Sequence, residues 1–160
     1  MSTPEDKLLV PYIERFNGNL CVQKKTYEEA VKRYNKSLIA LQMLFKMDKD
    51  PVITTEQQAI KFIKEIEVIV CVNLAHCYNQ LKNYHYAIKY CSQALEKDHQ
   101  NVKALYRIGV AYTRIGELEK AEENLSQVLE LQCDQDMKQS AQLALQEVKQ
   151  VERRNKSNEK

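Results

Sequence analysis

Hydrophobic positions along the chain recur at the spacing of an α-helix. The clearest case lies near the C-terminus, where a predicted helix over 134–154 places one apolar stripe: Met137, Ala141, Ala144, Leu145, Val148 and Val151. Glycine and proline, three of each in 160 residues, supply few turn signals, which favours long helices joined by short connections. The pattern therefore predicts an all-α protein.

Small and aromatic residues repeat along the chain with a period of 34. The segment 71–78, CVNLAHCY, matches 105–112, LYRIGVAY, so that Ala75 corresponds to Gly109. The period continues through three further pairs: Ala87 and Ala121, Cys91 and Leu125, Ala94 and Val128. An earlier copy is centred on Gly18, 57 residues before Ala75, which equals one period plus an insertion of 23. Small residues at matching places let paired helices approach closely, and such pairs must stack to bury their apolar faces.

The repeats also predict the domain organisation. We expect a single domain over 8–154, followed by a disordered tail at 155–160. Its parts are repeat 1 at 8–47, a loop at 48–54, repeat 2 at 55–98, repeat 3 at 101–132 and a capping helix at 134–154. Pro51 is a break signal within the loop, and Thr55 with Gln58 has the spacing of a capping box that starts the next helix.

Over residues 10–131 the pattern resembles the tetratricopeptide repeat (TPR), a unit of two helices, through its period and its small-residue positions. It departs from the family pattern in lacking the bulky aromatic early in the first helix of each repeat and the proline that closes each repeat. His99 and Cys133 stand at the positions of that proline. The resemblance implies three helix-turn-helix units stacked in a right-handed superhelix, with the first helix of each unit lining a concave groove. It also implies a protein-interaction module, not an enzyme.

Five polar residues on the first helices of the three repeats are expected to face this groove: Arg15, Asn19, Asn73, Lys103 and Arg107. In repeats 1 and 3 they are spaced i, i+4, so each pair shares one helix face. Lys103 and Arg107 are like charges, and the positions four residues away hold His99 and Ala111, not acids. An anion supplied by a ligand suits such a pair, because lysine and arginine form charge-assisted hydrogen bonds to carboxylates.

The set resembles the two-carboxylate clamp of chaperone-binding TPR domains, which grips both acid groups of a terminal aspartate. Its parts read Arg15-Phe-Asn-Gly18-Asn19, then Asn73, then Lys103-Ala-Leu-Tyr-Arg107, with Arg15 where the family has lysine. Together with the long insertion, these segments look like the C-terminal TPR domain of FK506-binding immunophilins. That resemblance implies, as partner, the C-terminal Glu-Glu-Val-Asp peptide of a heat-shock chaperone, the ninety-kilodalton one. It also implies a peptidyl-prolyl isomerase domain before the repeats, so we expect an excised fragment or a stand-alone relative.

Composition and motifs argue against other classes of function. A net charge of +2 predicts neither a nucleic-acid surface nor a membrane patch, and no apolar run approaches the length of a membrane span. Five cysteines, an odd number in a chain without a visible leader, favour reduced thiols and a cytoplasmic location. The sequence shows no cofactor loop, metal-ligand set or paired nucleophile and base, so we expect no cofactor, no metal and no catalysis.

Each candidate residue has a structural alternative. Lys103 and Arg107 could form a solvated face, and Asn73 could cap an internal backbone group. Asn19 could be a helix-surface residue, and Arg15 could pair with an acid on its own helix. The alternative function is a TPR scaffold that binds another protein, or itself, through an apolar groove.

Overall fold

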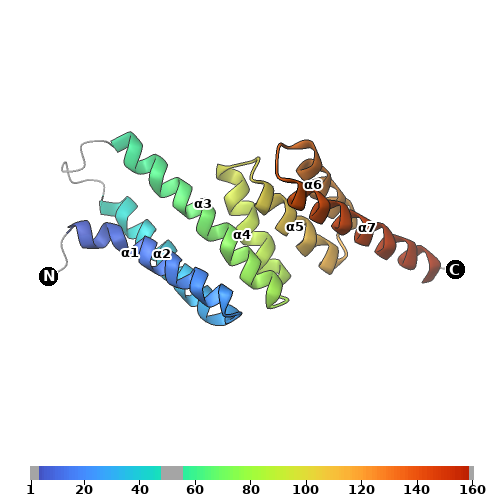
Figure 1. The fold of residues 1–160 in the computed structure, drawn as a ribbon, viewed down its shortest axis with the longest axis horizontal. Coiled ribbons are helices and arrows are strands. Elements are labelled where there is room, and N and C mark those ends of the chain that lie inside the picture. The colour runs from blue at the N-terminus through green and yellow to red at the C-terminus, as the bar shows by residue number, and fades with distance from the viewer. Residues whose placement is uncertain (1–3, 48–55, 159–160) are drawn as a thin grey trace.

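Seven α-helices make up the described part of the chain (Figure 1). The computed structural model describes residues 4–47 and 56–158. The helices are α1 (Pro4–Gln23), α2 (Tyr27–Met47), α3 (Glu56–Gln80), α4 (Tyr84–Lys97), α5 (Val102–Ile115), α6 (Leu118–Glu130) and α7 (Gln135–Asn158). No strand occurs within these ranges, and the predicted all-α class is confirmed.

The helices form three hairpins that follow one another along an elongated body, with the two termini at opposite ends (Figure 1). α1 pairs with α2, α3 with α4, and α5 with α6, while α7 packs on α6 and α5. α3 also contacts α5, so the first helices of the second and third hairpins lie side by side. The stacking therefore brings together helices that carry the predicted polar residues.

Small residues bring the two helices of a hairpin close together, as the repeat predicts. A Cβ added to Gly18 would lie 2.6 Å from the Tyr34 ring of α2, and one added to Gly109 would lie 2.6 Å from the Leu125 side chain of α6. Ala75, at the matching place in α3, is fully buried. Because the interior is already close-packed, a larger side chain at Gly18 or Gly109 would force the helices apart.

The turns inside the three hairpins share one backbone conformation. Lys25 and Lys82 both have φ of 58°, and Gly116 has φ of 83°. Lys82 lies 57 residues after Lys25 and 34 before Gly116, so the three positions match in the repeat. A left-handed residue ends a helix by turning N–H groups back to its last carbonyls, as Gly116 does toward Thr113 O at 3.3 Å.

The predicted disordered tail is wrong for residues 155–158, because α7 continues through Asn158. Lys156 Nζ lies 2.9 Å from Glu152 Oε1, an i, i+4 ion pair that favours one more helical turn. The spacing of this pair can be read from the sequence, but the prediction of a disordered tail followed the polar composition of the segment instead.

Other boundaries agree with the prediction to within a few residues. The first helix begins at Pro4, not at residue 8, and the capping helix begins at Gln135. The predicted loop at 48–54 and residues 159–160 lie outside the described residues.

Candidate functional site

Asn19 of α1 and Asn73 of α3 are in direct contact. The side-chain oxygen of Asn19 accepts hydrogen bonds from the Tyr34 hydroxyl at 2.7 Å and from the Asn73 amide at 3.3 Å. Asn19 is therefore not a plain surface residue, and Asn73 donates to a side chain, not to an internal backbone group. The Asn19 NH₂ group has no partner among the described residues, which leaves its N–H donors for a ligand.

Arg107 of α5 reaches across to α3. Its Nη1 donates to the Val72 carbonyl, next to Asn73, and its own carbonyl accepts a hydrogen bond from the Asn79 amide at 3.0 Å. Burial lowers the pKa of Arg107 from its ordinary value, but an arginine remains charged at neutral pH. Within the described part of the chain no carboxylate forms an ion pair with it. The site thus holds a largely buried positive charge without a counter-ion.

Arg15 of α1 is the second cation near the two asparagines. Its guanidinium carbon lies 5.9 Å from the centroid of the Tyr12 ring, and its Nε is buried without a hydrogen-bond partner. The neighbouring acid on its helix, Glu14, pairs instead with Arg33 of α2 at 3.4 Å. The alternative in which Arg15 pairs with an acid of α1 finds no support among the described residues.

The Tyr34 hydroxyl connects these elements. Burial raises the pKa of Tyr34 above its ordinary value, and the positive charges of Arg107 and Arg15 act in the opposite direction. Both arginines are therefore close enough to the hydroxyl to influence it electrostatically. The same hydroxyl holds Asn19, so the Asn19 hydrogen bond and the charges of Arg107 and Arg15 all act on one buried tyrosine.

Lys103 lies further out on α5 and is exposed. It shares with Arg107 a hollow of about 350 Å³ lined by His76, Asn79, Gln80, Lys103, Tyr106, Arg107, Val110 and Met137. None of these lining residues carries a carboxylate, so the hollow has a positive character. The structure thus joins Lys103 to the site through Arg107, and no described contact joins it to Arg15.

Sequence reasoning missed most of the residues that shape this site. The predicted set contains neither Tyr34 nor His76. His76 lines the same hollow as Arg107, and burial, followed by the charge of Arg107, lowers its pKa. Tyr106 and Val110 could have been found, because they continue the helix face of Lys103 and Arg107. Met137 could not, because it comes from α7 and only the stacking brings it to α5.

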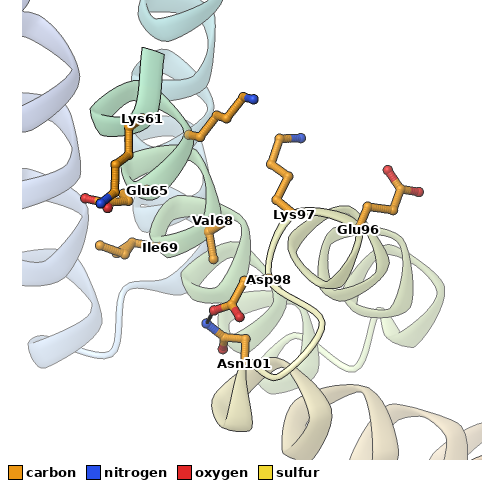
Figure 2. Close-up of a pocket in the computed structure, with 9 residues that line it drawn as sticks. Lys61, Glu65, Val68, Ile69, Glu96, Lys97, Asp98 and Asn101 are labelled. Atoms are coloured by element: carbon orange, nitrogen blue, oxygen red, sulfur yellow. Dashed lines mark hydrogen bonds between the residues drawn. The ribbon is translucent and has the colours of Figure 1, made fainter. Parts of the chain in front are cut away.

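A larger hollow, of about 800 Å³, contains none of the predicted residues. Figure 2 shows its side chains coming from α3, the end of α4 and the loop before α5. Positive and negative groups line it in equal number: Lys61, Lys64, Lys97, Glu65, Glu96 and Asp98. Lys97 pairs with Glu67 at 3.2 Å, and Asp98 accepts a hydrogen bond from Asn101 at 2.9 Å. Mixed charges do not select an anion, so the smaller hollow is the better candidate for carboxylate binding.

Two other properties concern the described residues only. None of the helices within 4–47 and 56–158 combines the length and the hydrophobicity that crossing a membrane requires. In the same ranges, no group of three or more His, Cys, Asp or Glu side chains is placed to hold a metal ion.

Comparison with known proteins identifies the repeat. Two family models described as tetratricopeptide repeat match the chain, at residues 68–101 and 90–123. Among solved structures, the C-terminal TPR-containing domain of a Plasmodium falciparum chain described as an FK506-binding protein is 32% identical, with a TM-score of 0.74. That match covers 95% of this chain and 97% of the other. The second TPR of Spaghetti (RPAP3) is 25% identical, with a TM-score of 0.60, and the match covers 81% of this chain and 91% of the other.

The chain belongs to the tetratricopeptide-repeat family, whose stacked helical hairpins bind other proteins. Within that family it resembles the TPR domains of FK506-binding proteins. FK506-binding protein 5 of Rhizopus delemar is 30% identical over 104 residues, which cover 65% of this chain and 25% of the relative. The chain thus spans about a quarter of the length of that curated relative.

Proposed function

We propose that this domain binds the C-terminal carboxylates of a peptide ending in Glu-Glu-Val-Asp, the tail of the ninety-kilodalton heat-shock chaperone. The observation that carries the proposal is the meeting of three hairpins at one polar site. The bonded pair of Asn19 and Asn73 lies beside Arg107, whose charge has no carboxylate partner among the described residues. A buried cation without a counter-ion costs free energy, and an anionic ligand offsets that cost.

A terminal aspartate matches this arrangement in charge and in the number of its acid groups. It carries one carboxylate on its side chain and one at the chain end, and the site has two cationic corners. Arg15 supplies one corner together with the free donors of Asn19, and Lys103 with Arg107 supplies the other. The hollow beside Arg107, with Val110 in its lining, receives the valine that precedes the aspartate.

The relatives support the same class of ligand. The second TPR of Spaghetti (RPAP3) is described as bound to the HSP90 peptide SRMEEVD, which ends in Glu-Glu-Val-Asp. The likeness to FK506-binding proteins favours the ninety-kilodalton chaperone as partner for this chain. A longer parent of the same class would carry a peptidyl-prolyl isomerase domain outside these repeats.

Isothermal titration calorimetry with the free-acid peptide Met-Glu-Glu-Val-Asp tests the proposal. We expect micromolar binding that weakens as salt is added, because the contacts are between charges. The C-terminally amidated peptide should bind far more weakly. The double variant Lys103→Glu/Arg107→Glu should lose at least about a hundredfold in affinity, because it replaces two cations by anions and the largely buried Arg107 contact alone contributes several kcal/mol on truncation.

A matched charge reversal away from the site provides the control. Lys36→Glu/Arg153→Glu changes net charge by the same amount at exposed positions of α2 and α7, and its affinity should stay close to that of the parent. The scaffold alternative predicts binding that is insensitive to salt and survives the Lys103/Arg107 reversal. Absence of binding to the free-acid peptide would refute the carboxylate proposal.

A further inference from the structure

His76 of α3 lies in the wall of the hollow that also contains Lys103 and Arg107. It follows Asn73 by three residues, so the two side chains share one face of α3. The imidazole is half-buried, and its ring lies edge-on to the ring of Tyr27 of α2, with the centroids 6.0 Å apart. Among the described lining residues, His76 is the one whose side chain changes charge near neutral pH.

The surroundings of His76 supply positive charge and no counter-ion. None of the ion pairs among the described residues includes His76. Burial, and then the charge of Arg107, lower its pKa, so the imidazole of the free site is neutral at neutral pH. No side chain of α1 or α4 lines the hollow. The titratable and charged groups that face His76 come from α2 and α5, and the rest of the wall is neutral: Tyr27; Lys103, Tyr106 and Arg107; Asn79, Gln80, Val110 and Met137.

The repeat relates His76 to the α5 side of the same hollow. The period of 34 residues matches His76 with Val110, as it matches Asn73 with Arg107. A peptide lying along the hollow therefore has His76 on its α3 side and Val110 on its α5 side. Successive side chains of an extended chain point in opposite directions. If the valine before the terminal aspartate faces Val110, the glutamate before that valine faces His76.

We propose that His76 recognises this glutamate: it takes up a proton from solvent as the peptide binds, and its imidazolium pairs with the glutamate carboxylate. The inference rests on the proposed function and adds a third cationic contact to the two corners that hold the aspartate. The anionic peptide favours the charged imidazole, because it supplies the counter-ion that the free site lacks and opposes the charge of Arg107. The peptide carboxylates have ordinary pKa values of about 4, so they stay ionised near neutral pH. The proton taken up therefore belongs to the protein.

Calorimetry with the free-acid peptide Met-Glu-Glu-Val-Asp at pH 7.5 and pH 6.0 tests this linkage. The affinity of the parent chain should rise about threefold at the lower pH, the size expected for a charge pair that is partly exposed. Titrations at pH 6.0 in two buffers of different ionisation enthalpy should reveal net proton uptake. His76→Asn should bind like the parent at pH 7.5, gain nothing at pH 6.0 and take up no proton. His85→Asn and His99→Asn, at exposed positions, are the matched controls and should keep the rise.

Peptide variants test the glutamate on the unaltered protein, so they do not depend on how a protein variant folds. Met-Glu-Gln-Val-Asp, which lacks the carboxylate next to the valine, should bind without the rise at pH 6.0. Met-Gln-Glu-Val-Asp lacks the other glutamate carboxylate and should keep it.

The outcomes separate this inference from the carboxylate proposal. An affinity of the parent that is equal at the two pH values would overturn the role of His76 and leave aspartate binding intact. A rise that persists in His76→Asn, or with Met-Glu-Gln-Val-Asp, would do the same. A parent chain that binds the free-acid peptide at neither pH would overturn both proposals.

Discussion

At the α1–α3 corner of the site, polar groups are already bonded to one another: Tyr34 holds Asn19, and Asn19 holds Asn73. At the α5 corner, two cations stand without carboxylate partners among the described residues, and only Arg107 is anchored, to the Val72 carbonyl. The first corner is therefore fixed by its own hydrogen bonds, whereas the second carries positive charge. A fixed corner contributes geometry at low entropic cost, and a charged corner contributes attraction.

The largest effect should come from the buried cation. We expect Arg107→Ala to weaken peptide binding about a hundredfold, because its charge acts where water is largely excluded. Lys103→Ala should cost only about fivefold, because the ammonium is exposed and solvent screens it. Calorimetry on both variants measures the ratio. Equal losses would show that burial does not distinguish the two cations.

A smaller effect is expected at the prearranged corner. Tyr34→Phe removes the hydroxyl that donates to Asn19, and should lower the free energy of unfolding by about 1 kcal/mol and peptide affinity about threefold. Tyr84→Phe is the control, because the Tyr84 hydroxyl makes no hydrogen bond within the described residues. Urea unfolding and calorimetry give the two numbers. An unchanged affinity for Tyr34→Phe would mean that Asn19 holds its position without the hydroxyl.

The smallest expected effect is on the pH dependence of the free energy of unfolding, through His76 in the hollow beside Arg107. Burial, and then the charge of Arg107, lower the pKa of His76 below its ordinary value of 6.5. As pH falls below 6.5, the unfolded chain takes up this proton before the folded chain does, so stability decreases. His76→Asn should flatten the dependence of unfolding free energy on pH in that window. His85→Asn, at an exposed position of α4, should leave it unchanged.

Much of the fold could be predicted because the repeat places a small residue at the same position of each helix pair, where close packing requires one. Gly18, Ala75 and Gly109 recur at one place in each unit, and the structure shows close helix contacts or full burial at all three. The apolar stripe also located the start of the last helix to within one residue. The end of α7 was missed because low hydrophobicity was given more weight than an i, i+4 ion pair.

The site was only partly predictable, for a physical reason. Asn19, Asn73 and Arg107 stand out because polar groups on otherwise apolar helix faces need partners. Tyr34 does not stand out, since its ring fills a packing position and only its hydroxyl reaches the site. The hollow requires α3, α5 and α7 together, and no single segment encodes it.

The shared turn conformation has a consequence for engineering. Lys25 and Lys82 occupy a left-handed backbone that Gly116 adopts freely at the matching place. A side chain with a Cβ costs roughly 1 kcal/mol in that conformation. Glycine at either lysine position is therefore expected to stabilise the first or the second hairpin, at a turn that contributes no residue to the candidate site.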